Sequence, residues 1–273
     1  VIWHYIVKKS LIKNKKLYFI DVKNGEDEEY GARLLCSMKF LSLYQKNYYW
    51  HRTRKKGGLR YSMDLKSTES YLKVFLEYYK FISKKNLSYN KLNFIDSCIK
   101  FAAGEFSARI ILHSRNEIKK ITSRIQSYSN ISTTSVNKIK NNTLYSSLKN
   151  KKNILYHKDI VTKNILKKLN VIKFKFKKIY IYCAAVHGVA TLNILKKNKF
   201  KVTSLVDDNL VLEKQTFMNV DVISGKSFLK KITQKRSEIL VIVCQQSTKT
   251  FDKIANKLKL KGIKSSQIIH IMY

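Results

Sequence analysis

Hydrophobic residues in the last third of the chain gather in short runs separated by polar segments. Their length and their content of Ile and Val predict buried strands. These runs occupy 178–183, 201–206, 220–223, 239–243 and 268–271. Helical patterns fit between them, through Leu192 and Leu195, around 225–233 and over 248–261. Apolar strands that alternate with helices predict a parallel sheet covered by helices, so the fold class expected for 173–273 is α/β.

The middle of the chain shows the periodicity of helices. A helix is expected to begin at Ser67-Thr68-Glu69, because hydroxyl side chains are favoured at helix starts. Its buried face is expected to hold Tyr71, Val74, Phe75, Tyr78 and Ile82. A second helical region is expected from about 94 to 125. Residues 67–126 are therefore interpreted as a helical extension.

A change of composition separates this extension from the last third. From 127 to 152 Ser, Thr, Asn and Lys dominate, which favours a solvated linker. The apolar pattern returns over 153–170 and fits one helix. The chain is therefore divided into four regions. They are 1–66, the helical extension 67–126, a basic linker 127–172 that contains the helix fitted to 153–170, and the α/β domain 173–273.

An acidic run stands out in the first region. Glu26, Asp27, Glu28 and Glu29 follow one another in a chain with 55 Lys and Arg and only 18 Asp and Glu residues. Like charges in contact raise one another's pKa, so such a run needs a physical reason. One interpretation is a helix N-terminus, where carboxylates complement the helix dipole. The other is an acid/base site with one carboxylate in reach of a substrate hydroxyl.

The flanks of the acidic run carry a second signal. Upstream stand 3–11 (Trp-His-Tyr-Ile-Val-Lys-Lys-Ser-Leu) and 17–19 (Leu-Tyr-Phe), and downstream follow 33–35 (Arg-Leu-Leu) and 47–54 (Asn-Tyr-Tyr-Trp-His-Arg-Thr-Arg). This order resembles the second half of the catalytic domain of family-two glycosyltransferases, which are inverting enzymes of the GT-A type. The resemblance covers about the first 60 residues and implies a GT-A half-domain over 1–66.

The resemblance implies roles for individual residues. Asp27 would be the general base that takes the proton from the acceptor hydroxyl, with Glu26 as the alternate. His51, Arg52 and Arg54 would lie near the donor pyrophosphate, where positive charge offsets the leaving group. From the residues alone, the same basic group also fits an exposed strand end in a Lys-rich protein.

The implied reaction is transfer of a sugar, with inversion, from a nucleotide-sugar donor to a glycan or lipid-linked acceptor in capsule or lipopolysaccharide synthesis. Family members hold a divalent metal, Mg²⁺ or Mn²⁺, with an Asp-x-Asp motif in an upstream nucleotide-binding half. This chain begins at Val1 and carries no such motif, so the resemblance implies a fragment that is inactive alone, with no metal ligand assigned. Arg33 is expected to pair with the acidic helix.

The start of the α/β domain has its own resemblance. The segment 178–188 reads Lys-Ile-Tyr-Ile-Tyr-Cys-Ala-Ala-Val-His-Gly. It is similar to the Rossmann-like modules of polysaccharide-synthesis proteins, including the sugar-nucleotide-binding half of sugar acyltransferases, which open with strand-Gly-Ala-Gly-x-x-Gly. Cys183 and Ala185 replace the first two glycines, which serve the turn and the approach of a pyrophosphate. Only Gly188 remains.

Asp207 follows this turn by about 20 residues, where an acid that binds a ribose is expected in dinucleotide-binding domains. Two interpretations of the domain stay open. One is weak binding of a nucleotide or nucleotide sugar at Ala184, His187, Gly188 and Asp207. The other is a scaffold that holds partner proteins and binds no nucleotide.

Charge and composition bound the partners. The net charge is +37 and proline is absent, which with abundant Lys, Asn and Ile points to AT-rich coding. Such a charge suits nucleic acid, but no zinc-finger, helix-turn-helix or RNA-binding pattern accompanies it. It also suits an anionic membrane surface, which attracts Lys and Arg at about 1 kcal/mol each. A cytoplasmic protein at the inner face of the plasma membrane is expected, with nucleic-acid binding as the less favoured alternative.

The cysteines narrow the chemistry further. Cys36, Cys98, Cys183 and Cys244 are isolated in apolar stretches, so no pair indicates a zinc or redox site. They fit core positions of a protein in a reducing compartment. No run approaches the ~20 apolar residues of a membrane-spanning helix.

Overall fold

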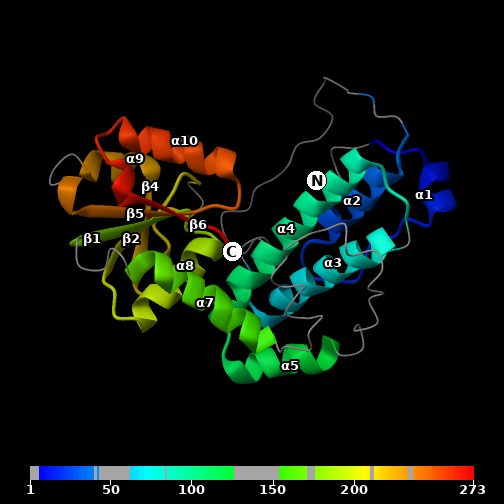
Figure 1. Cartoon of the computed structure of the whole chain (residues 1–273), viewed down its shortest axis with the longest axis horizontal. Helices are drawn as coiled ribbons and strands as arrows, with labels where there is room; N and C mark the ends of the chain where they lie inside the picture. Colours follow the sequence, from blue (N-terminus) through cyan, green and yellow to red (C-terminus); the bar gives the residue numbers. More distant parts are fainter. Residues whose placement is uncertain are drawn as a thin grey trace. The chain divides into compact units, whose positions relative to one another are not determined.

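The chain forms two compact units (Figure 1). The computed structural model describes residues 6–39, 42, 62–83, 85–125, 154–170, 176–209, 212–232 and 236–273. The first unit comprises 1–106 and 119–146, and the second comprises 107–118 and 147–273. Helices α4 (Tyr89–Leu112) and α5 (Arg115–Ile125) therefore contribute residues to both units.

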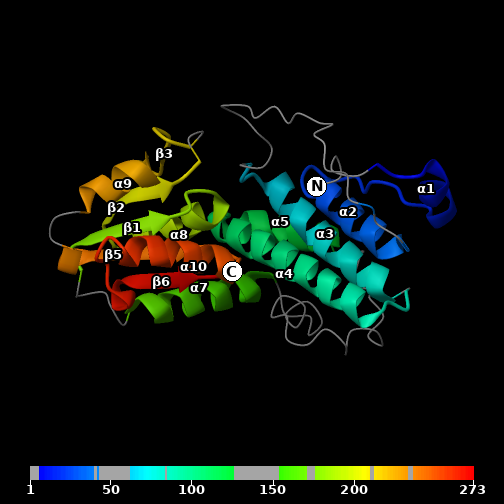
Figure 2. The ribbon, with the colours of Figure 1, turned by 90° about the horizontal axis from the view of Figure 1, so that it is seen from above.

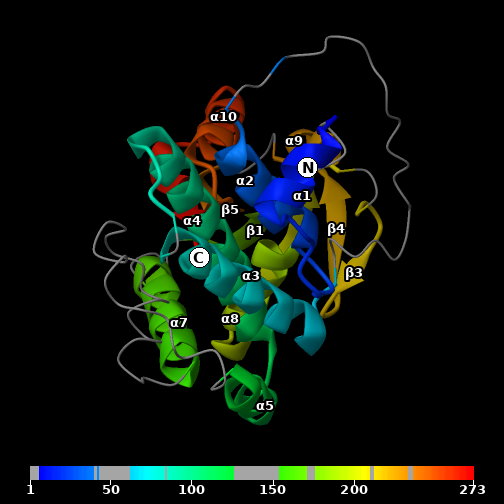
Figure 3. The same cartoon turned by 90° about the vertical axis from the view of Figure 1, so that its right-hand side faces the viewer.

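The described part of the first unit is helical. Besides most of α4 it contains α1 (Lys9–Lys15), α2 (Glu26–Ser37) and α3 (Leu65–Ser83); α1 and α2 are separate helices at the blue end of the ribbon (Figure 3). The buried face predicted for α3 is confirmed for all five of its residues. The sequence pattern also predicts two short strands over 39–51, and this segment lies for the most part outside the described residues.

Side-chain caps explain where α3 and α5 begin. Helix α3 starts ahead of Ser67, because Asp64 caps it: the Ser67 N–H donates to Asp64 Oδ1 at 2.7 Å. The helical region expected over 94–125 is confirmed, but as two helices. Between them Ser114 and Glu117 form a capping box, in which Ser114 N donates to Glu117 Oε2 at 2.7 Å and Glu117 N to Ser114 Oγ at 3.3 Å.

The second unit is built around a six-stranded sheet with the order β3-β4-β2-β1-β5-β6 (Figure 2). All neighbouring strands are parallel except β3, which pairs antiparallel with β4 at one edge. The strands are β1 Lys178–Tyr182, β2 Val202–Asp207, β3 Thr216–Phe217, β4 Val220–Ser224, β5 Ile239–Cys244 and β6 Ile268–Ile271. The predicted α/β class with a parallel, Rossmann-like sheet is confirmed, and β3 is too short to form a recognisable run.

Helices cover both faces of this sheet (Figure 1). One face carries α7 (Ile154–Asn170) and α8 (Val186–Lys197), and the other carries α9 (Gly225–Lys231) and α10 (Thr248–Lys259). Short 3-10 helices, η5 (Arg236–Glu238) and η6 (Ser265–Gln267), precede β5 and β6. The helix expected over 153–170 is therefore present as α7, within the second unit.

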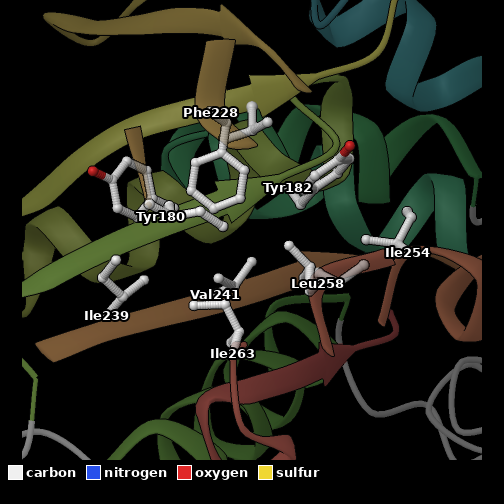
Figure 4. Close-up of a cluster of buried hydrophobic side chains, with 11 residues drawn as sticks. Tyr180, Tyr182, Phe228, Ile239, Val241, Ile254, Leu258 and Ile263 are labelled. Carbon is white, nitrogen blue, oxygen red and sulfur yellow. The ribbon is translucent and has the colours of Figure 1, made fainter. Parts of the chain in front are cut away.

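The core beneath α9 and α10 is partly aromatic (Figure 4). Tyr180 and Tyr182 of β1 point to this face and pack on Phe228 of α9, with ring centroids 4.7 and 6.2 Å away. Alternate residues of a strand face opposite sides of a sheet, and Ile179 accordingly lies with Leu195 on the α8 side. Among the helices of the described residues, none is long and apolar enough to cross a membrane.

Polar contacts tie the end of α4 to α7 and α8 within the second unit. His157 of α7 is 1% exposed, and its Nε2 lies 2.8 Å from Ser107 Oγ. Asn193 Nδ2 of α8 donates to Ile111 O at 3.0 Å. Burial lowers the pKa of His157 to about 4, because the imidazolium loses its hydration there.

The free energy of unfolding is expected to fall as pH drops from about 6.5 to about 4. In that interval the unfolded chain binds a proton at His157 and the folded chain does not, so acid favours unfolding. The full pKa shift corresponds to a loss of roughly 3 kcal/mol. Denaturant titrations at pH 7, 5.5 and 4 should show a steeper decline for the wild type than for His157→Gln. Parallel declines in both proteins would contradict this account.

Candidate functional site

The carboxyl ends of parallel strands form the edge at which open α/β sheets bind ligands, at the point where the strand order reverses. In this sheet β1 lies between β2 and β5, so the order reverses at β1. The turn from β1 into α8 and the loop from β5 into α10 both leave this edge. The four site residues predicted for the α/β domain all lie here: Ala184, His187, Gly188 and Asp207.

The turn after β1 keeps a glycine-like conformation without the glycine. Cys183 has φ +76°, in the left-handed region that costs other residues about 1–2 kcal/mol. Its N–H donates to Val206 O of β2 at 2.8 Å, which holds it beside that strand. Burial raises the pKa of the Cys183 thiol to about 12, so the thiol is protonated at neutral pH.

Gly188 allows α8 to approach β1 closely. A Cβ atom at Gly188 would lie 2.0 Å from Cys183 O, so no other residue fits without a backbone shift. This is the packing role of the third glycine in a dinucleotide-binding turn. Ala185, the N-cap of α8, provides no side-chain cap for the first amides of the helix.

Asp207 is held over this turn by backbone hydrogen bonds. Its Oδ2 accepts from Ala184 N at 2.7 Å, and its Oδ1 accepts from Asn209 N at 2.8 Å. The structure thus brings together Ala184 and Asp207, which are far apart in sequence.

Asp208 has a different surrounding. Its Oδ2 accepts from Tyr182 OH at 2.8 Å, and its Oδ1 lies 3.5 Å from Lys257 Nζ. A Cβ at Gly225, the first residue of α9, would lie 1.9 Å from Asp208 Oδ1. Burial and the neighbouring Asp208 carboxylate raise the pKa of Tyr182 well above its usual value. Asp208 therefore joins β1, α9 and α10, while Asp207 serves the turn.

The loop after β5 faces the same turn, although its residues were not among those predicted for the site. Gln245 Nε2 lies 3.2 Å from Cys183 Sγ, and Gln246 Nε2 lies 2.8 Å from His187 Nε2. The sequence feature that could have indicated them is a pair of glutamines directly after an apolar strand, because parallel sheets bind ligands at that edge.

The acidic run forms the first turn of α2, as the helix-start interpretation predicts. Asp27 Oδ1 accepts from Glu28 N at 2.9 Å, and Gly25 precedes the helix with φ +84°. Burial raises the pKa of Glu26. The proposed roles of Asp27 and Glu26 as acceptor base stay predictions.

Glu29 is the fully buried member of this run, with 0% exposure. Arg33 donates to it through two nitrogens, with Nε–Oε1 2.5 Å and Nη2–Oε2 2.7 Å, and also to Tyr18 O at 2.6 Å. The ion pair expected for Arg33 is confirmed. Burial raises the pKa of Glu29, although Arg33 acts in the opposite direction.

The remaining predicted residues concern the sugar donor and a metal. His51, Arg52 and Arg54 lie outside the described residues. Within the part of the chain that the structure describes, no group of three or more His, Cys, Asp or Glu side chains is placed to hold a metal ion.

Comparison with known proteins gives no family. No family model and no curated protein matches the sequence. Two solved structures are distantly similar: RSP in complex with β-NADH (14% identity, TM-score 0.31) and RSP described as a Rex-family repressor (14% identity, TM-score 0.30). Each match covers 73% of this chain and 84% of the other. At these TM-scores the likeness identifies neither a family nor a ligand.

Replacing Arg33 by Met should lower the free energy of unfolding by about 3 kcal/mol, because it leaves the buried Glu29 carboxylate without its main partner. The double variant Glu29→Gln/Arg33→Met should recover much of this loss. Lys80→Met, at the exposed pair with Glu77, is the control and should change stability by less than about 1 kcal/mol. Denaturant unfolding measures all three, and an Arg33→Met loss no larger than that of the control would contradict the buried pair.

Replacing Gly188 by Ala should destabilise the chain by about 2 kcal/mol or more, because the new methyl group must displace β1 or α8. Gly31→Ala in α2 is the matched control, since a Cβ there meets no atom within 4 Å. The control should be neutral or stabilising by roughly 0.5–1 kcal/mol. A Gly188→Ala protein that unfolds at the wild-type denaturant concentration would show that α8 is not fixed by this contact.

Proposed function

We propose that the second unit binds a nucleotide at the carboxyl edge of its sheet, between β1 and β2. The observation that carries the proposal is the hydrogen bond from Ala184 N to Asp207 Oδ2, 2.7 Å long, at the strand where the order reverses. It joins the turn that begins α8 to the acid at the end of β2. These are the two places that hold the phosphate and the ribose in a nucleotide-binding α/β sheet.

Each residue has a part in this binding. The amides of His187 and Gly188, in the first turn of α8, would bind the phosphate, aided by the helix dipole. The Asp207 carboxylate, at the end of β2, would bind ribose hydroxyls. The Ala185 methyl stands where a glycine would let the phosphate come closer, so we expect a weak site, with Kd in about the 0.1–1 mM range.

The chemistry supports binding rather than covalent catalysis at this site. The nucleophilic form of a cysteine is the thiolate, and burial holds the Cys183 thiol in its protonated form. The Asp207 carboxylate is already engaged by two backbone amides. A nucleotide-binding module, rather than a transferase centre, is therefore the function proposed for this unit.

Calorimetry of the whole chain against millimolar AMP, ADP, UDP and UDP-glucose tests the proposal. The buffer needs about 0.15 M salt, because a chain of net charge +37 attracts anions without selectivity. Asp207→Asn should weaken binding about tenfold through loss of a ribose acceptor. Asp252→Asn, which removes the same charge from the exposed face of α10, should not. Absence of heat with every nucleotide would favour the scaffold interpretation.

A further inference from the structure

Two glutamines connect the loop after β5 to the turn after β1. Gln245 Nε2 donates to Cys183 Sγ at 3.2 Å, and Gln246 Nε2 lies 2.8 Å from His187 Nε2. An amide nitrogen can only donate, so His187 Nε2 is the acceptor and the ring carries its proton on Nδ1. These two hydrogen bonds, here called the glutamine bridges, cross the point where the strand order reverses.

The loop that carries the two glutamines also contacts β6. The Gln245 carbonyl accepts from His270 Nε2 of β6 at 2.6 Å. The His270 ring stacks on Phe251 of α10, with centroids 4.1 Å apart and planes 7° from parallel. The backbone of Gln245 is therefore anchored to β6 through the His270 ring, which itself packs on α10.

Tyr273 lies against His187, one end of a glutamine bridge, with the two ring centroids 5.3 Å apart. Its hydroxyl donates to His187 O at 3.1 Å and lies 2.6 Å from Thr191 Oγ1. Thr191 Oγ1 in turn lies 3.1 Å from Cys244 Sγ. Because the His187 carbonyl can only accept, the direction of each hydrogen bond in this chain is fixed. Tyr273 donates to the carbonyl, Thr191 donates to Tyr273, and Cys244 donates to Thr191.

The two sides of the reversal point therefore differ. On the β2 side stand Asp207 and the amides that begin α8. On the β5 side stand Gln245 and Gln246, which form the glutamine bridges. A dinucleotide places one nucleotide on each side of the reversal point and its pyrophosphate between them. The glutamine bridges join the two loops that flank this crossing, so a group attached beyond the second phosphate would meet them.

We infer that this site takes a nucleoside mono- or diphosphate, and that Gln245 and Gln246 exclude ligands that extend beyond the second phosphate. The inference rests on the nucleotide site proposed above and adds its selectivity. Dinucleotides and nucleotide sugars must break both glutamine bridges before they bind, whereas a nucleoside diphosphate ends at the start of α8.

Two matched ligand pairs test this inference on the whole chain. ADP and NAD⁺ share adenosine diphosphate, and UDP and UDP-glucose share uridine diphosphate, so each pair differs only beyond the second phosphate. The wild type should bind the shorter member at least about tenfold more tightly. In Gln245→Ala/Gln246→Ala the longer member should gain about tenfold in affinity, while the shorter member changes less than about twofold. Asn256→Ala, which removes an exposed amide from α10, is the control and should leave both affinities unchanged.

The outcomes separate this inference from the nucleotide site itself. Equal affinity of the wild type for both members of a pair overturns the inference and leaves the nucleotide site standing. The same holds when the double variant gains nothing for the longer ligand. If the wild type binds neither ligand of a pair and the double variant binds both, the bridges close the whole site, and this result also overturns the inference. No binding by any of the proteins overturns the nucleotide site and the inference together. Thermal unfolding of each variant confirms that it is folded.

Discussion

The close approach of α8 to β1 is the constraint on which the candidate site depends. A single hydrogen atom on Gly188 separates the helix from the Cys183 carbonyl, since a methyl group there would lie 2.0 Å from the oxygen. This contact fixes where α8 begins, and therefore where the amides of its first turn lie. It also sets the turn whose Ala184 amide reaches Asp207. The sheet supplies the edge, and the close approach at Gly188 sets the geometry of the candidate site.

The turn after β1 keeps its conformation although Cys183 replaces its first glycine. Cys183 adopts φ +76° at a cost of about 1–2 kcal/mol, and hydrogen bonds to Val206 and Gln245 on either side hold it there. A side chain at this position has a consequence that glycine would not have. It offers the loop after β5 an acceptor, so the substitution that preserves the turn also provides one end of a glutamine bridge.

The sequence predicts the frame of the second unit well because most of its strands are short apolar runs that alternate with helical patterns. It predicts the edge at which Ala184, His187, Gly188 and Asp207 lie for the same reason, since Asp207 ends β2 and the other three lie in the turn and first helical residues after β1. It does not reveal the glutamine bridges or the contacts of Tyr273. Those join residues about 60 to 86 positions apart, and no periodicity links them. The start of α3 at Asp64 and the capping box at Ser114 were visible as local signals, but helical periodicity alone cannot place a helix end.

The charge of the chain bears on selectivity in an indirect way. A net charge of +37 raises the local concentration of every anion, nucleotide or not, and so cannot distinguish among them. Selectivity must come from groups that are neutral or negative. In the proposed site Asp207 would fulfil this condition, because a carboxylate accepts hydrogen bonds from hydroxyls and repels further phosphates. The glutamines fulfil it as well, since an amide bridge excludes by occupying space and by the hydrogen bonds that a ligand would have to replace. In a protein this basic, selectivity for a ligand at the carboxyl edge of the sheet would therefore depend on the acidic and neutral side chains there.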